Sequence, residues 1–154
     1  MADIVFNIAK GRVAELYNRV KTADPSAARL YVIPISAGAV SDATALDVDT
    51  FADLVTAGVT ERTANGWNRK TLAAADLASM APDDTNNRMD IDIPDQTWTA
   101  VSTDAVTDLV ICYSATASPT NAQLVPLTLH DFAVTPSGGD VTAQIAAAGF
   151  YRAS

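Results

Sequence analysis

The sequence predicts an α+β fold, in which a helical N-terminal third is followed by a mainly antiparallel β-sheet or sandwich. Apolar residues recur at helical spacing in residues 7–21 and again in residues 46–55. Beyond Gly58 the apolar period shortens to two, and turn residues separate short runs rich in β-branched and aromatic side chains. The chain has 154 residues, with no visible repeat or linker. We therefore expect a single domain over residues 1–154.

The first predicted helix spans residues 7–21, with Asn7 as its cap and one apolar face formed by Val13, Leu16, Tyr17 and Val20. The second spans residues 46–55 and stops before Gly58. Its apolar residues are Val48, Phe51, Leu54 and Val55. Between them, residues 30–35 form a continuous apolar run bounded by Pro34 and a Ser/Gly turn. This run predicts a buried strand.

The remainder of the chain predicts short strands. An Asn65-Gly66 turn signal precedes an alternating stretch at residues 67–72, and residues 73–80 suit one short helix. Pro94 indicates an edge or a bend before Trp98. The turn-rich run at residues 135–140 predicts a hairpin between the last two strands. The later strand candidates are residues 89–93, 109–113, 124–129, 132–134 and 141–145.

Charge is distributed unevenly along the chain, whose formal net charge is −8. Residues 71–151 carry ten acidic residues and one cation, Arg88. Such a surface repels phosphate backbones and anionic lipid, so we expect no nucleic-acid partner and no membrane partner. No apolar run reaches the roughly 18 residues that span a bilayer. The first residues lack the pattern of a signal peptide, which predicts synthesis in the cytoplasm.

The residues that usually carry catalysis are few. Cys112 is the only cysteine and lies in an apolar run, so it is interpreted as buried and structural. His130 is the only histidine, and its neighbour Asp131 would point to the opposite face of a strand. No nucleophile elbow, phosphate loop or dinucleotide fingerprint is present. The sequence thus predicts a non-enzymatic protein without catalytic residues, cofactor or internal disulfide.

The acidic loop at residues 83–90 is the best candidate for a metal site, because clustered Asp and Asn oxygens suit calcium. It lacks the glycine and the closing glutamate of an EF-hand, and Arg88 lies among the proposed ligands. We interpret it as a solvated turn in which Arg88 holds a carboxylate, and we predict no metal. Asp90 and Asp92 share one strand face. A polysaccharide hydrolase that uses this carboxylate pair is therefore a competing hypothesis.

Both ends of the chain are candidates for contact with a partner. Ile4, Val5 and Phe6 are large apolar residues near the N-terminus, so residues 1–6 are a candidate interaction arm. The alternative is that they form a strand or staple within their own domain. Four cations follow and would attract the acidic part of a neighbour: Lys10, Arg12, Arg19 and Lys21. The aromatic residues Phe150 and Tyr151 predict a docked tail, on the same domain or on a neighbour.

Four stretches together resemble a family of small virion structural proteins of tailed bacteriophages, which are often encoded beside the major capsid gene. The most distinctive is the closing run LVPLTLHDFAVTPSGGDVTAQIAAAGFYRAS, residues 124–154. The others are residues 7–21, the strand at residues 68–72, and DDTNNRMDIDIPDQTWTAV at residues 83–101. They cover most of the chain, and none of them is a catalytic signature.

The resemblance implies a minor capsid or head decoration protein on the outside of the virion head. Its partners would be the major capsid protein and other copies of itself, with a trimer favoured because decoration proteins commonly occupy local three-fold positions. A tail-associated structural protein is the first alternative. A host-attachment module that binds carbohydrate is the second.

Overall fold

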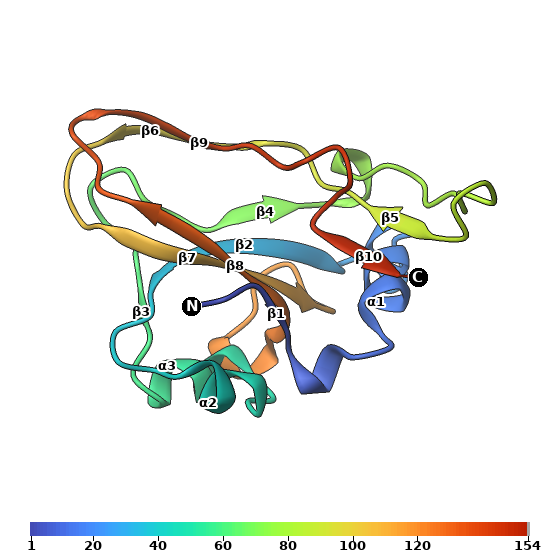
Figure 1. Ribbon diagram of the computed structural model, residues 1–154, viewed down its shortest axis with the longest axis horizontal. Coiled ribbons are helices and arrows are strands. Elements are labelled where there is room, and N and C mark those ends of the chain that lie inside the picture. The colour runs from blue at the N-terminus through green and yellow to red at the C-terminus, as the bar shows by residue number, and fades with distance from the viewer. Residues whose placement is uncertain (154) are drawn as a thin grey trace.

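The structure is a computed structural model that describes residues 1–153, so Ser154, the last residue of the predicted domain, lies outside the described part. It has three layers (Figure 1). A central antiparallel sheet lies in the middle, two short helices cover one face, and two two-stranded ribbons cover the other. The predicted α+β class, with helices and antiparallel sheets, is therefore confirmed, although strands predominate.

The central sheet has the strand order β1-β8-β7-β2-β3. Its long strands are β2 (Arg29–Ser36), β7 (Val106–Ser114) and β8 (Val125–Val134). The two-residue strand β1 (Ile4–Val5) pairs with β8 at one edge. At the other edge, β3 (Thr60–Glu61) and β4 (Lys70–Leu72) pair with different halves of β2. Every pairing is antiparallel.

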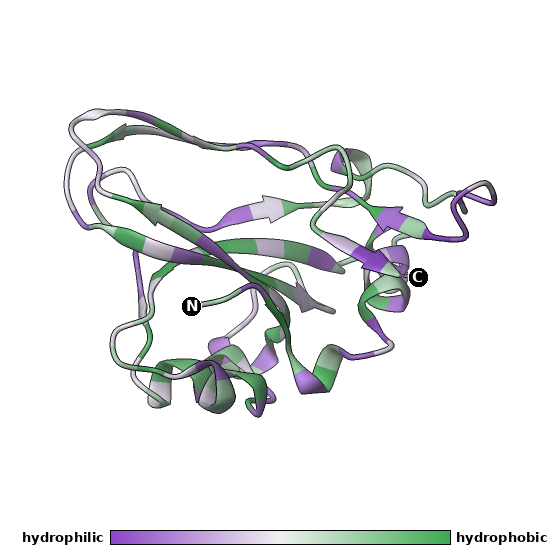
Figure 2. Ribbon diagram, in the orientation of Figure 1, coloured by the Kyte–Doolittle hydropathy of each residue, from purple (hydrophilic) through white to green (hydrophobic). Residues whose placement is uncertain are grey.

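Strand β7 is apolar on both faces because both faces are covered. Leu109 and Ile111 belong to the core on the ribbon side, whereas Val110 and Cys112 belong to the core on the helix side. This burial explains a continuous apolar run where a half-solvated strand would alternate. The hydropathy view shows apolar stretches on the central strands and on the short helices that cover one face (Figure 2).

The helix-side core is closed by α2 (Asp42–Leu46) and α3 (Phe51–Thr56). The ribbon-side core contains α1 (Val13–Lys21) and both ribbons. One ribbon pairs β6 (Gln96–Val101) with β9 (Gly139–Ala143). The other pairs β5 (Met89–Ile91) with β10 (Tyr151–Ala153). The last strand thus lies beside a strand about 60 residues earlier, and the aromatic tail docks on its own domain.

The tryptophans lie in the ribbon-side core. Trp67 is 2% exposed and Trp98 is fully buried, and their ring centroids are 5.2 Å apart. Each indole N–H donates to a backbone carbonyl, that of Trp67 to Asp104 at 2.8 Å and that of Trp98 to Asn68 at 2.7 Å. Both residues serve packing, because the polar atom of each ring is satisfied internally.

The helices of the structure are shorter than those that the sequence predicts. The N-terminal one is divided into a 3-10 turn, η1 (Asn7–Ala9), and α1, because Gly11 adopts φ +77° between them. Asn7 caps neither and donates instead to Asp47. The four apolar residues of the predicted face are all buried in α1.

The second predicted helix, residues 46–55, is likewise divided. Thr50 begins α3 with a capping box, in which its side chain accepts the Asp53 N–H and the Asp53 carboxylate accepts the Thr50 N–H. The predicted helix at residues 73–80 is a single 3-10 turn, η2 (Ala74–Asp76). A further 3-10 turn, η3 (Asn121–Gln123), precedes β8.

The N-terminal third is only partly helical, since it contains β1 and the central strand β2, which is the buried strand predicted at residues 30–35. One further prediction is wrong. The stretches at residues 124–129 and 132–134 form one strand, β8, and the expected hairpin after it is absent from the described pairings. Instead, β8 pairs with β7 and β1, whereas β9 pairs with β6 in another layer.

Candidate functional site

A cavity of about 320 Å³ lies between the ribbon-side face of the central sheet and the segment that joins β9 to β10. Its floor is apolar and is formed by Val32 of β2 with Leu109 and Ile111 of β7. The joining segment, residues 144–150, forms its roof. In Figure 1 this segment runs from β9 towards β10, above the central strands. The cavity is large enough for one side chain or a small ligand.

The polar groups of the cavity are Asp3, His130 and Asp131. Asp3 Oδ1 accepts the backbone N–H of Asp131 at 2.8 Å, and Asp3 Oδ2 lies 3.9 Å from His130 Nδ1. His130 Nε2 lies 2.9 Å from the hydroxyl of Thr128. Burial lowers the pKa of His130, and the opposing effect of Asp3 is smaller. The imidazole is therefore neutral at pH 7, and the polar rim of the cavity is anionic.

Sequence reasoning placed Asp131 on the opposite face of the strand from His130. The structure agrees, since His130 is partly buried beside Phe150 whereas Asp131 is exposed. The residue that approaches the imidazole is Asp3, which lies 127 positions earlier in the sequence. Its carboxylate is 3.9 Å from the ring and 70% exposed, a poor position for orienting a catalytic base.

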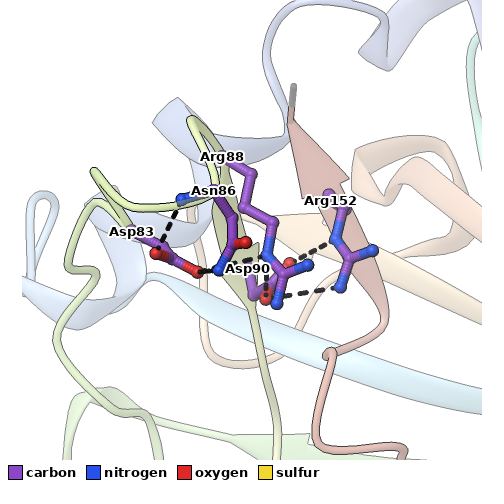
Figure 3. Close-up of polar contacts among 5 residues, drawn as sticks. All are labelled: Asp83, Asn86, Arg88, Asp90 and Arg152. Carbon is purple, nitrogen blue, oxygen red and sulfur yellow. Dashed lines mark hydrogen bonds and ion pairs between the residues drawn. The ribbon is translucent and has the colours of Figure 1, made fainter.

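In the acidic loop at residues 83–90, the carboxylates form ion pairs with Arg88 (Figure 3). Asp83 and Arg88 form an isolated antiparallel bridge, and Asn86 donates to Asp83 through its backbone and its side chain. Arg88 Nε lies 3.4 Å from Asp83 and 3.1 Å from Asp90. Within residues 1–153, no group of three or more potential ligands is arranged for a metal ion. The interpretation of a turn closed by Arg88 is confirmed.

Asp90 and Asp92, the pair of the hydrolase hypothesis, lie in different surroundings. Asp90 is bound by Arg152 at 2.6 Å, and this hydrogen bond is the main reason that its pKa is lowered. Burial raises the pKa of Asp92, and its carboxylate accepts the N–H of Ile93. The cavity roofed by residues 144–150 is lined by Asp3 and Asp131 instead. Asp90 is thus paired with arginine, which does not favour the hypothesis that Asp90 and Asp92 act as the carboxylate pair of a hydrolase.

Cys112 is fully buried in the helix-side core, and burial raises the pKa of its thiol. A thiol without access to solvent and without a tendency to ionise is a structural residue, as predicted from the sequence.

The apolar N-terminal residues belong to their own domain, which is the alternative that the sequence left open. Ile4 and Val5 pair with Leu129 and Thr128 of β8, and Phe6 is fully buried in the helix-side core. The Met1 amino nitrogen lies 2.9 Å from Asp108 Oδ1, a fully buried carboxylate on β7. Residues 1–6 therefore do not form a free arm in this structure, because they pair with β8 and pack into the core of their own domain.

The four N-terminal cations differ in availability. Lys10, Arg12 and Arg19 are exposed, whereas Lys21 donates to the carbonyls of Ala74 and Leu77 and holds α1 against η2. Lys10 donates to Asn7, and Arg12 pairs with Glu15 at 3.4 Å. The exposed basic surface thus consists of Lys10, Arg12 and Arg19.

Sequence reasoning missed the cavity and its polar rim. Its lining comes from β2, β7, β8, the residues before β1 and the segment before β10. A usable signal was the run of small residues at 146–149, Ala-Ala-Ala-Gly, which leaves little side-chain volume above the sheet.

Comparison with protein-family models, with curated proteins and with solved structures finds no match to this chain. Within residues 1–153, no helix is long and apolar enough to cross a membrane.

Proposed function

We propose that this chain is a non-enzymatic virion structural protein that binds the outside of a bacteriophage head lattice as a decoration or minor capsid protein. The observation that carries the proposal is the surface. Val55 is the only large apolar side chain that residues 1–153 expose, at 38%. A domain with two filled cores and a polar surface stays soluble before assembly and binds through many modest contacts.

Charge supports the same role. The exposed cations Lys10, Arg12 and Arg19 lie on the N-terminal segment, whereas residues 71–151 carry ten acidic residues against one cation. A basic patch on one copy is complementary to the acidic surface of a neighbour or of a shell. Such contacts mainly speed and orient docking, and salt weakens them.

The proposed partners are the major capsid protein and other copies of this chain. We propose a trimer at local three-fold positions. Its interfaces would be polar, because a large apolar trimer interface would appear on the isolated chain as a large exposed apolar patch. The alternative of a carbohydrate-binding attachment module has less support, since Trp67 and Trp98 are buried and cannot stack on sugar rings.

The experiment is co-sedimentation of the purified protein with heads assembled without it. The proposal predicts saturable binding that weakens as salt increases from 50 to 500 mM. Matched samples of tails from the same virions serve as a control for the tail-associated alternative. Binding to tails alone, or to neither, would contradict the proposal.

A further inference from the structure

We propose that the cavity beneath residues 144–150 receives one apolar side chain of a partner protein other than a second copy of this chain, from a segment that carries lysine or arginine beside that side chain. This inference rests on the proposed function and deepens it, because it names the surface that docks and the chemistry of what docks there. Three features of the cavity carry it.

The first feature is the apolar floor of the cavity. Val32, Leu109 and Ile111 belong to the ribbon-side core, are 1%, 4% and 2% exposed, and line the cavity from below. Within residues 1–153, Val55 is the only exposed large apolar side chain, so the surface offers no competing apolar patch. Binding energy at protein interfaces concentrates where an anchor side chain fills a pocket and loses its water. The cavity, of about 320 Å³, offers such a pocket.

The second feature is the charge of the rim. The titratable side chains of the lining are Asp3, Asp131 and His130, and the lining includes no lysine or arginine. The Asp3 side chain is 70% exposed, and its Oδ2 lies no nearer than 3.9 Å to His130, so this oxygen can meet a cation at the rim, whereas the side chain of Asp131 lies on the opposite face of β8 from His130. An apolar anchor flanked by lysine or arginine matches this arrangement, whereas an anchor flanked by carboxylates is repelled.

The third feature is the attachment of the roof. Ile145 N–H donates to Asp95 at 2.8 Å, and Phe150 N–H donates to the carbonyl of Ile91 at 2.9 Å. Between these points, Gly149 N–H donates to Ala146 within the segment itself. Ala146 and Ala147 are both exposed, but only Ala146 lines the cavity. A segment that is fixed at its two ends and bears small side chains leaves room for a partner's side chain between it and the sheet.

This difference between two neighbouring alanines gives a matched pair of variants. Ala146→Trp places a large ring at the cavity and fills it, whereas Ala147→Trp adds the same ring outside the lining. Both are first compared with wild type by urea unfolding. If Ala146→Trp fails to fold, Asp3→Lys replaces it, with Asp49→Lys as its control, because both aspartates are exposed.

The cavity is tested directly with two peptides, acetyl-Lys-Phe-Lys-amide and acetyl-Glu-Phe-Glu-amide, followed by the ring resonances of His130. We expect the lysine peptide to shift these resonances at millimolar concentration and the glutamate peptide to bind at least tenfold more weakly. Ala146→Trp should abolish the shift, and Ala147→Trp should retain it. No shift, or equal shifts with both peptides, would overturn the inference.

Co-sedimentation with undecorated heads then separates this inference from the proposed function. We expect at least a tenfold loss of affinity for Ala146→Trp and none for Ala147→Trp. If both variants bind heads as wild type does, the cavity is not the docking site and the decoration role stands. If wild type ignores heads while the lysine peptide still binds, the decoration role fails and the cavity remains a docking site. Loss of self-association in Ala146→Trp alone would show that a second copy occupies it, contrary to the inference.

Discussion

Arg152 Nε lies 2.6 Å from Asp90 Oδ1, across the antiparallel pair of β10 and β5. These residues are direct register partners, so the ion pair lies on a backbone ladder that already joins the last strand to the middle of the chain. Arg88 approaches the same carboxylate at 3.1 Å, so that two arginines share Asp90 (Figure 3).

Removing Arg152 should raise the pKa of Asp90. The hydrogen bond from Arg152 is the largest cause of the lowered pKa, so Arg152→Gln should move it back towards the ordinary value of 3.8. Arg88→Gln should cause a smaller rise, because Arg88 acts only through its charge. The measurement is an NMR titration of the side-chain carboxyl carbons, with Arg12→Gln as the control that leaves Asp90 unchanged. An equal rise in all three variants would refute this assignment.

Gly149→Ala should destabilise the protein strongly. A Cβ at this position would lie 2.1 Å from the carbonyl oxygen of Ile91, and Gly149 has φ +75°. We expect a loss of roughly 3 kcal/mol or more in the free energy of unfolding. Gly138→Ala is the control, since Gly138 has φ +98° and nothing within 4 Å of the added Cβ. That change should cost only the backbone term of roughly 1 kcal/mol. Similar losses measured in urea for both variants would contradict the clash.

The only histidine should make stability depend on pH in a window above that of the carboxylates. The pKa of His130 is lowered by burial in the folded state, from 6.5. As the pH falls below 6.5, the unfolded chain binds a proton that the folded chain does not, so the free energy of unfolding decreases until the folded pKa is reached. Asp3 is the charged residue that opposes this shift. The lowered pKa values of Asp83 and Asp90 act only below about pH 4.

The measurement is urea unfolding between pH 7.5 and pH 5. Wild type should lose stability across this range, and His130→Gln should lose much less. Equal slopes for the two proteins would show that His130 is not the responsible group.

Thr50→Ala should weaken α3. The Thr50 side chain accepts the Asp53 N–H at 3.2 Å and donates to the Asp53 carboxylate at 2.7 Å. Losing such a cap costs roughly 1 kcal/mol. Ser137→Ala, at an exposed turn, should cost much less. A lower thermal midpoint for Thr50→Ala alone is the expected result, and no difference between the two variants would count against the capping box.

Reversing the basic surface should weaken binding to heads. Lys10→Glu combined with Arg12→Glu should lower the affinity at least tenfold at 50 mM salt and much less at 500 mM salt, because salt screens exposed charges. Arg62→Glu changes a cation that lies elsewhere and should have a small effect. The double change alters the net charge by −4 and Arg62→Glu by −2. A loss of binding free energy for the double change that is no more than twice the loss for Arg62→Glu, measured by co-sedimentation, would therefore mean that net charge rather than this surface is responsible.

The sequence predicted the elements whose burial produces a local pattern. The face of α1 follows the helical period, and β7 is a continuous apolar run, so both were identified. The pairing of strands that lie far apart in the sequence produces no such local pattern. Residues 132–134 and 141–145 flank a strong turn signal, yet β9 pairs with β6 because the ribbon-side core needs a second layer over the central sheet.

The same limit applies to the candidate site. Asp3 and His130 are brought together only because β1 pairs with β8, and a two-residue strand is too short to be read from its period. The acidic loop was interpreted correctly because Arg88 lies among its carboxylates in the sequence itself. For Phe6 the sequence left two roles open, contact with a partner and packing in its own domain, because an apolar residue near a terminus has the same pattern in either role. The structure buries Phe6 fully in its own core.

The most direct test of the decoration role is electron cryomicroscopy of virions that carry this chain, compared with virions from which its gene has been deleted. The account predicts density for this domain on the outer face of the head, arranged about local three-fold positions and absent from the deletion particles, with the cavity beneath residues 144–150 facing the shell. Heads that look identical with and without the chain, or density for it confined to the tail, would contradict the account.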